Sequence, residues 1–490
     1  QRKHKCAASK QASMMNNAQA HLAVASSSSS PFHGAHHLLL NSNGRRPAGR
    51  RPPLLLPLAV RCGPAAQMLL TTKTTPTATA IGNVKSGMMK EATDLFHVID
   101  YHHVEFWCAD AASAAARFSF GLGVPLAAQS DLSTGNTAHA SRLLRARSGS
   151  LAFLFTAPYA PQVGDAATAS VPSFSADAAR RFTGTHGGLA VRAVAVRVSD
   201  AAEAFARSVE AGARPAFGPA DLGHGFRVAE VELSGDTVLR FVSYPADNTD
   251  DVSFLPGFQD VLSTGVPDFG LKRIDHIDVN VPELAPVAAN VSGFTGFHQF
   301  WEFTHDQFRT AETGMNGVVL ANDAETVLLT LVEPVYGTKR RGHVETFLEH
   351  HGGPGVQHLA IMSEDILGTL REIRARSSMG GFELLAPPPA SYYDGARERA
   401  GDVLSEAQMK ECQELGVRVD RGDDDGVVLQ MFTKPTGDRP TLLLEFVQRI
   451  GCMDKEGGEQ RAVCGGFAKR NVPDLIKAIE DYGKTLDAPA

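Results

Sequence analysis

Residues 1–90 contain no Asp or Glu, and the first acidic residue of the chain is Glu91. Of the 47 Lys and Arg residues, 12 lie in this segment. Because the net charge of the whole chain is −7, a leader of +12 leaves the other 400 residues at −19. Such an acidic body argues against nucleic acid as a partner.

Long apolar runs and paired cysteines are also missing. No stretch of 18 apolar residues occurs, which predicts that the chain has no membrane span. The six cysteines include no CxxC pair, so we expect neither a disulfide scaffold nor a thiolate zinc finger. This cysteine usage favours a reducing compartment. The 490 residues predict two to four domains with a sizeable core.

The leader, residues 1–93, has no acidic residue before Glu91, is rich in Ser, Ala, Pro and Arg, and includes Ser26–Ser30 and Arg45–Pro53. This composition is typical of an organelle transit peptide, and Val60–Gly63 resembles a plastid processing site. We therefore predict a disordered leader and a plastid protein. The alternative is a cytoplasmic protein whose leader is a translated upstream region without structure.

The body alternates short β runs with amphipathic helices, which predicts an α+β fold. Three strand motifs recur in the same order, at offsets of 173, 165 and 205 residues: His103–Trp107 with His276–Asn280, Val191–Ala195 with Val356–Ala360, and Val238–Val242 with Leu443–Val447. Asp200 and Asp365 follow the second pair as helix caps. We predict a duplication, with a metal-free domain at 94–245, a linker at 246–270 and a second domain at 271–490.

The two copies of the repeat differ in the residues that could bind a metal. At the matching positions the second copy carries His276, His358 and Glu445, whereas the first copy carries His103, Ala193 and Arg240. Two imidazoles and one carboxylate form the facial triad that suits non-heme Fe(II). Taken singly, each residue would be an ordinary strand residue, and only their coincidence within the repeat indicates a metal. We predict one metal per chain, in the C-terminal half.

Several longer motifs identify a family. They are Gly293–His298, Gly337–Arg340, Gly355–His358, Phe432–Pro435, Gln448–Cys452 and Cys464–Phe467. In these motifs, residues 97–487 resemble the plant 4-hydroxyphenylpyruvate dioxygenases of the vicinal-oxygen-chelate superfamily. The resemblance implies two tandem domains of paired βαβββ modules, a metal-binding open barrel in the C-terminal one, and a homodimer. It also places the family's iron ligands on His276, His358 and Glu445.

The same resemblance implies a reaction. A 2-oxo acid, 4-hydroxyphenylpyruvate, and O2 would give homogentisate and CO2, a step of tyrosine catabolism that supplies plastoquinone and tocopherol precursors. The residues implied in substrate binding are Gln357, Gln430, Phe432, Phe467 and Asn471, and a C-terminal helix, Asp474–Leu486, would gate the pocket. Gln357 precedes a ligand on its strand, so it points to the opposite face unless the strand is bulged.

The departures from the family pattern lie around the substrate. Gly317, Val332 and His343 replace the family's Ser, Asn and Gln near the phenol, Val472 replaces a Phe, and Thr330 replaces a Pro. An unpaired buried hydroxyl costs about 1–3 kcal/mol, so these changes would weaken binding of the family substrate and leave an alternative substrate open. The alternatives are phenylpyruvate, an aliphatic 2-oxo acid, or benzylic hydroxylation; a third possibility is an inactive paralogue.

Asp278 replaces the family's Val two residues after the first ligand. Residues two apart on a strand face the same side, so its carboxylate should point where His276 points. Three roles are open: an acceptor that orients a ligand, a solvated carboxylate at the barrel rim, or a competitor of Glu445 for iron.

Overall fold

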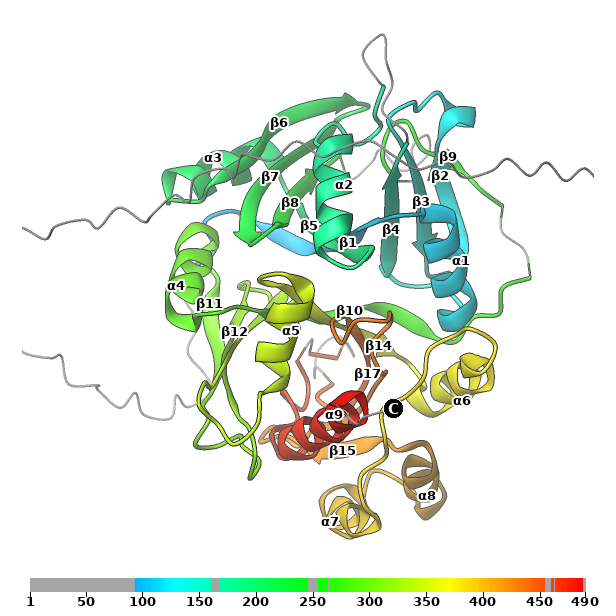
Figure 1. The fold of residues 1–490 in the computed structure, drawn as a ribbon, viewed down its shortest axis with the longest axis vertical. Helices are drawn as coiled ribbons and strands as arrows, with labels where there is room; N and C mark the ends of the chain where they lie inside the picture. The colour runs from blue at the N-terminus through cyan, green and yellow to red at the C-terminus, as the bar shows by residue number, and fades with distance from the viewer. Residues whose placement is uncertain are drawn as a thin grey trace, which may run out of the picture. The chain divides into compact units, whose positions relative to one another are not determined.

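The computed structural model describes residues 93–159, 168–245, 254–262, 265–453, 460–461 and 463–487. The expected leader, apart from Thr93, lies outside the described residues, as does the first part of the expected linker. The described chain forms two large sheets, with helices on their outer faces (Figure 1). Both sheets belong to one compact unit.

The first sheet has nine strands in the order β6-β7-β8-β5-β1-β4-β3-β2-β9. Their bounds are β1 Val98–Cys108, β2 Leu126–Ser130, β3 His139–Arg145, β4 Ala152–Pro158, β5 Leu189–Val198, β6 Pro215–Gly223, β7 Phe226–Ser234, β8 Thr237–Ser243 and β9 Gln259–Asp260. The short strand β9 pairs with β2, so part of the expected linker 246–270 adds to the edge of this sheet.

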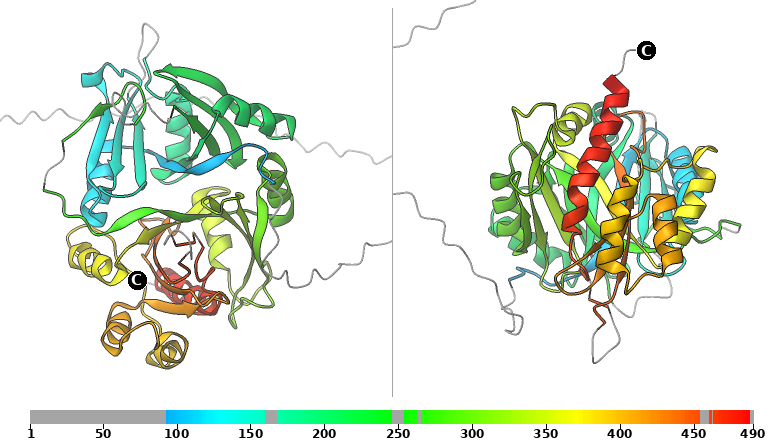
Figure 2. Two further views of the ribbon diagram at one scale, coloured as in Figure 1. Left: turned by 180° about the vertical axis from the view of Figure 1, so that it is seen from behind. Right: turned by 90° about the horizontal axis from the view of Figure 1, so that it is seen from below.

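The second sheet has eight strands in the order β11-β12-β13-β10-β14-β17-β16-β15. Their bounds are β10 Leu271–Asn280, β11 His298–Phe303, β12 Met315–Ala321, β13 Leu328–Pro334, β14 Gly355–Ser363, β15 Arg418–Arg421, β16 Val427–Phe432 and β17 Leu443–Ile450. This sheet curls around a cavity, and the last helix lies over its open side (Figures 1 and 2).

The helices within the described residues cap and cover these sheets. They are α1 Ala111–Leu122, α2 Ala176–Thr185, α3 Ala201–Glu210, α4 Leu284–Thr295, α5 His343–His351, α6 Ile366–Ser377, α7 Ala390–Ala400, α8 Glu406–Leu415 and α9 Val472–Asp487, with short 3-10 turns η1 Leu132–Thr134 and η2 Lys469–Asn471. Asp200 caps α3 and Asp365 caps α6 through their carboxylates, as the sequence predicts.

The chain repeats one βαβββ unit four times. The units are β1-α1-β2-β3-β4, β5-α3-β6-β7-β8, β10-α4-β11-β12-β13 and β14-α6-β15-β16-β17. The first strands of two units pair antiparallel at the centre of each sheet. The three motif pairs found in the sequence fall on β1 and β10, β5 and β14, and β8 and β17, which are neighbours in the same order in both sheets. The predicted duplication and fold class are therefore confirmed.

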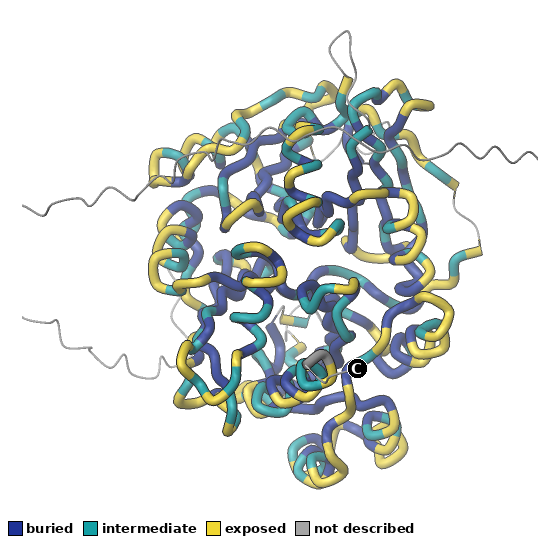
Figure 3. The backbone as a smooth tube through the Cα atoms, in the orientation of Figure 1, coloured by how far each residue is buried: buried dark blue, intermediate teal, exposed yellow. Residues whose placement is uncertain are grey.

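Burial follows the sheets. The strand segments are mostly buried, while the outer faces of the helices are exposed (Figure 3). Val, Ile, Leu and Phe on the strands build a continuous core that includes side chains from both sheets. The two halves also share polar contacts, such as the Tyr101 hydroxyl donating to the Leu328 carbonyl at 2.6 Å. Among the described residues, no helix is long and apolar enough to cross a membrane.

Candidate metal centre and substrate cavity

Three neighbouring strands, β10, β14 and β17, bring His276, His358 and Glu445 together. Their order in the sheet puts His276 and Glu445 on either side of Ala360, the register partner of both. Glu445 Oε2 lies 3.2 Å from His276 Nε2 and 3.4 Å from His358 Nε2. The three side chains offer donor atoms that lie within 4.8 Å of one another, so a single ion could contact all of them.

The charges of this cluster are strongly coupled. Burial opposes charge on Glu445, but the neighbouring His276 and His358 outweigh it and lower the pKa of Glu445 to about 2. Burial likewise opposes charge on His276, but Glu445 and Asp275 raise its pKa to about 9. A metal ion would replace the proton that now balances the carboxylate, since histidine must be neutral to bind a metal.

A buried ion pair fixes the orientation of His276. Asp275 Oδ1 lies 3.0 Å from His276 Nδ1, and Asp275 is held by Arg449 through bonds of 2.7 and 2.8 Å. Burial works against charge on Asp275, but Arg449 keeps the pKa of that carboxyl well below its ordinary value. A carboxylate behind a ligating histidine sets the ring orientation and raises its basicity.

Glu445 is positioned by an amide relay. Gln430 Nε2 donates to Glu445 Oε1 at 2.9 Å, and Asn471 Nδ2 donates to Gln430 Oε1 at 2.7 Å. The Tyr392 hydroxyl in turn donates to Asn471 Oδ1 at 2.6 Å. Asn471 is buried at the foot of α9, so the relay connects the candidate metal centre with the start of that helix.

A cavity of about 90 Å³ opens beside the triad, which is room for a small molecule rather than one water. The structure places six of the predicted site residues on its wall besides the triad, the last of them on α9: Asp278, Val332, Gln430, Phe432, Phe467 and Val472. The Phe432 ring lies 5.6 Å from that of His358, and the Phe467 ring lies 5.1 Å from that of His276.

Other predicted residues lie elsewhere. Gln357 and His343 line a neighbouring cavity beside the C-terminal part of α9, and Gln357 Oε1 lies 2.6 Å from His358 Nδ1. The β10–β14 register skips Gln357 between His358 and Val356, so the strand is bulged there, and the side chain of Gln357 contacts the ring of the neighbouring candidate ligand. Asn471 orients Gln430 and does not line the triad cavity. Burial lowers the pKa of His343 to about 4, so its ring is neutral at pH 7.

The far end of the triad cavity is apolar because an aromatic ring fills the place of a side chain. A Cβ at Gly317 would lie 2.1 Å from Cζ of Phe303, so Phe303 occupies the space of the family's Ser. Phe303 packs with Val332, Met315 and Trp301 in one hydrophobic cluster. Apolar side chains thus lie where the family resemblance led us to expect polar residues.

Asp278 and Thr330 add polar groups to the middle of the cavity. They are register partners on the parallel strands β10 and β13 and both line the cavity. Asp278 is 4% exposed, so the solvated-rim alternative is wrong. It is not part of the triad's donor cluster. Its nearest ionic contact is His358 Nδ1 at 3.8 Å, and burial raises the pKa of Asp278 to about 6.

The matching place in the first sheet holds a salt-bridged arginine. Arg240 is the register partner of Ala195, as Glu445 is of Ala360. Its guanidinium bonds Glu105 at 2.6 Å, Glu230 at 2.7 Å and His103 Nε2 at 3.1 Å. A cation that is paired with two carboxylates occupies the position at which a metal would need an anionic ligand.

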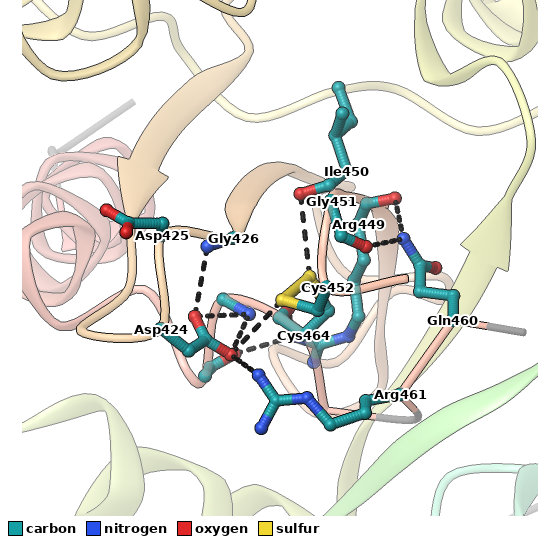
Figure 4. Close-up of a disulfide and its surroundings, with 12 residues drawn as sticks. Asp424, Asp425, Gly426, Arg449, Ile450, Gly451, Cys452, Gln460, Arg461 and Cys464 are labelled. Atoms are coloured by element: carbon teal, nitrogen blue, oxygen red, sulfur yellow. Dashed lines mark hydrogen bonds and ion pairs between the residues drawn. A yellow bond between two sulfur atoms is a disulfide. The ribbon is translucent and has the colours of Figure 1, made fainter. Parts of the chain in front are cut away.

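Cys452 and Cys464 form a disulfide with a Cα–Cα distance of 5.6 Å, a pairing that the cysteine spacing and the expected reducing compartment did not predict. Asp424 lies beside it, accepting from the backbone N–H of Gly426 and from Arg461 (Figure 4). Arg449 donates to the Cys464 carbonyl at 2.7 Å. The disulfide therefore anchors the segment that leads to Phe467 at the cavity wall.

Sequence reasoning missed several contributors to the site. Asp275 and Arg449 lie 174 residues apart, and no spacing rule links them. Trp301 stacks on Phe467 at 5.6 Å, but in the sequence it is one aromatic residue among several on a strand. The usable signal was Gly317, because a glycine inside a strand often marks the close approach of another group.

The fold and the cavity define a class: paired βαβββ modules of the vicinal-oxygen-chelate type with a candidate metal centre in the second sheet. No family model matches the chain. It is 67% identical to a 4-hydroxyphenylpyruvate dioxygenase of Hordeum vulgare over 399 residues, which cover 81% of this chain and 90% of the relative. It is 54% identical to the Arabidopsis thaliana enzyme over 406 residues, with coverage of 81% and 90%. The chain belongs to the 4-hydroxyphenylpyruvate dioxygenase family.

Solved structures agree with this fold. A triple mutant of 4-hydroxymandelate synthase from Streptomyces coelicolor superposes with a TM-score of 0.63 at 25% identity, covering 79% of this chain and 99% of the other. A fusion of a xylose isomerase-like TIM barrel with a 4-hydroxyphenylpyruvate dioxygenase superposes with a TM-score of 0.55 at 18% identity, covering 81% of this chain and 55% of the fusion protein.

Proposed function

We propose that this protein is an Fe(II)-dependent dioxygenase that converts 4-hydroxyphenylpyruvate and O2 to homogentisate and CO2. The observation that carries the proposal is the convergence of two imidazoles and one carboxylate on one buried point beside a cavity. That donor set suits non-heme Fe(II) and leaves positions for other ligands. Two plant relatives that match this chain over 90% of their length are both named 4-hydroxyphenylpyruvate dioxygenase.

His276, His358 and Glu445 are the residues that would hold the iron. When bound, Fe(II) supplies a Lewis-acid centre that chelates the 2-oxo acid and activates O2. The orientation of one ligand is already fixed in the protein, because Asp275, held by Arg449, hydrogen-bonds the ring of His276. A ligand whose own partners are fixed loses little conformational freedom when it binds the metal.

The remaining cavity residues would bind and shield the substrate. The ring of Phe432 lies next to that of His358, and the ring of Phe467 lies next to that of His276. Both would flank an aromatic side chain of the substrate. The relay from Asn471 to Gln430 keeps Oε1 of Glu445 hydrogen-bonded, so Oε2, which lies near both imidazoles, is the oxygen that would be free to hold a metal. Helix α9 contributes Val472 and Leu475 to the wall and excludes water from the reacting end.

A second candidate is the same iron chemistry on a different 2-oxo acid. Phe303 in the space beside Gly317 favours it, because it leaves the far end of the cavity without a partner for a phenol. Phenylpyruvate, an aliphatic 2-oxo acid, or a substrate hydroxylated at the benzylic carbon would suit that end better. An unpaired phenol would weaken binding by about 1–3 kcal/mol.

The test is O2 uptake by the iron-loaded full chain with 4-hydroxyphenylpyruvate, with products identified by mass. Homogentisate in proportion to the O2 consumed supports the first candidate. O2 uptake only with another 2-oxo acid supports the second. If iron is retained but no 2-oxo acid stimulates O2 uptake, the enzyme proposal fails and an inactive paralogue is left.

We also propose that the protein acts in a plastid as a homodimer. The Ser- and Arg-rich composition of the leader, which has no acidic residue over 1–90, supports the location, and the family resemblance supports the dimer. Fractionation of cells that express the full chain with a C-terminal tag tests the first proposal, and a purely cytosolic signal would contradict it. Sedimentation of the purified protein tests the second.

A further inference from the structure

The triad cavity holds two buried polar side chains whose hydrogen-bonding capacity is not used by the protein. Thr330 Oγ1 is buried with no hydrogen-bond partner in the structure. Asp278 is 4% exposed, and its nearest ionic contact is 3.8 Å away. Unsatisfied polar groups of this kind cost free energy in an apolar site, so their presence indicates a ligand that pairs with them.

In the first sheet, the residue equivalent to Asp278 has hydrogen-bond partners within the protein. Glu105 is the register partner of Ala193 on β5, as Asp278 is of His358 on β14. Glu105 accepts from Arg240 at 2.6 Å and from the Thr156 hydroxyl at 2.7 Å. At the same place in the second sheet, the carboxylate faces a cavity in place of these donors.

The strand register fixes the depth of the pair. Asp278 follows His276 by two residues on β10, which is one step of about 6–7 Å along the strand on the same face. Val332 follows Thr330 by two on β13 and is paired with Gly317 on β12. Asp278 is also the register partner of His358 on β14. The cavity wall therefore runs from His276 and Glu445, through the Asp278–Thr330 pair beside His358, to the apolar end at Val332 and Phe303.

From this arrangement we infer that Asp278 and Thr330 are specificity-determining residues that recognise a hydrogen-bond donor in the middle of the substrate's side chain. The preferred substrate class is a 2-oxo acid with a hydroxyl part-way along the side chain and an apolar tip. In an arylpyruvate this means a hydroxyl at ring position 2 or 3. The inference rests on the proposed function, because it assumes that the 2-oxo acid end lies at the triad.

The preferred position of the hydroxyl is tested with four ligands: phenylpyruvate and its 2-, 3- and 4-hydroxy derivatives. Their dissociation constants are measured without O2 on the iron-loaded full chain, by quenching of Trp301 fluorescence and by calorimetry. Trp301 lines the cavity, and Trp107, the other tryptophan of the chain, lies in the first sheet. A hydrogen bond to a carboxylate predicts that the better of the 2- and 3-hydroxy isomers binds about 10- to 100-fold more tightly than phenylpyruvate.

Variants assign this preference to the pair. In Asp278→Val and Thr330→Val, the ratio between phenylpyruvate and the preferred isomer should fall towards one, and Asp278→Asn should retain part of it. The matched control is Val332→Asn, at the apolar end, which should improve the 4-hydroxy isomer and leave the ratio for the 2- and 3-hydroxy isomers in place. Iron content of each variant shows whether the metal site is intact.

The outcomes separate the two proposals. Binding of all four arylpyruvates without a preference for position 2 or 3 overturns the role of the pair and leaves the proposed function standing. A preference that survives in both Asp278→Val and Thr330→Val also overturns it. If none of the four binds to the iron-loaded chain, the proposed function fails and this inference fails with it.

Discussion

The two sheets of this protein share one scaffold and differ in what their central strands carry. In the second sheet, His276, His358 and Glu445 face one another across β10, β14 and β17. In the first sheet, the same strand positions carry His103, Ala193 and Arg240, and the arginine is neutralised by carboxylates. One scaffold thus builds either a candidate metal centre or a closed ion-pair cluster.

The difference shows how few residues decide between the two. An arginine at the carboxylate position removes an anionic ligand and supplies a charge that repels a cation, and an alanine at the second histidine position removes another ligand. The buried cluster that results is satisfied by its own hydrogen bonds. In the second half, the corresponding cluster is left open to a cavity. Predictions that break this contrast follow, from the largest effect to the smallest.

Copying the first half into the second should abolish turnover. Glu445→Arg places a cation at the candidate metal centre, and we expect no 2-oxo acid-dependent O2 uptake. Glu445→Gln keeps the shape but removes the charge, and uptake should fall by at least about 100-fold, since loss of even an outer partner of a ligand costs 10- to 100-fold. Glu230→Gln in the first half is the control. Wild-type uptake in Glu445→Gln would contradict the assignment.

Removing the cation of the first half should destabilise the fold. Arg240→Met leaves Glu105 and Glu230 buried without their partner, which costs about 3–5 kcal/mol in the free energy of unfolding. Denaturant titration measures it. The control is Arg207→Met on the surface of α3, whose exposed pair with Glu203 is worth at most about 1 kcal/mol. Equal effects of the two changes would show that the Arg240 cluster has no special weight.

A serine side chain at position 317 should clash with the ring of Phe303. Gly317→Ser forces Phe303 to move, and overpacking of this kind costs about 1–3 kcal/mol. Phe303→Ala should relieve the clash, so a double-mutant cycle will show coupling. Gly293→Ser on α4 has no atom within 4 Å of its new Cβ and serves as the control. Additive effects at 317 and 303 would contradict the account of the apolar end.

The first half should also lose stability in acid, through a buried histidine outside the candidate metal centre. Burial, and then Arg240, lowers the pKa of His139 to about 4, whereas the unfolded chain titrates near its ordinary value of 6.5. The unfolded state therefore binds the extra proton as pH falls from 6.5 to 4, and stability is lost over that window by about 1.4 kcal/mol per pH unit. His139→Gln should flatten the slope of unfolding free energy against pH by one proton. An unchanged slope would contradict this.

Much of this fold could be predicted from the sequence because it repeats. The three motif pairs lie on equivalent strands, and the caps Asp200 and Asp365 begin the helices that follow. The repeat also predicted the clustering of His276, His358 and Glu445, because strand alternation and order are enough to place three side chains on one face.

What the sequence could not supply were contacts that depend on packing between distant strands. The support of His276 by Asp275 and Arg449, and the entry of Phe303 into the space at Gly317, require the curl of the sheet. The Cys452–Cys464 disulfide follows from the path of the chain beyond β17. Substitution patterns indicated a remodelled pocket, but only the register of β10 with β13 placed Asp278 beside Thr330.

The most direct test of the contrast between the halves is the stoichiometry of Fe(II) binding by the full chain under anaerobic conditions. The account predicts one iron per chain in the wild type, one in Glu230→Gln, and none retained in Glu445→Gln. Two irons per wild-type chain would show a second metal site and contradict the contrast between the halves. One iron retained when Glu445 is changed would show that the triad is not the metal site.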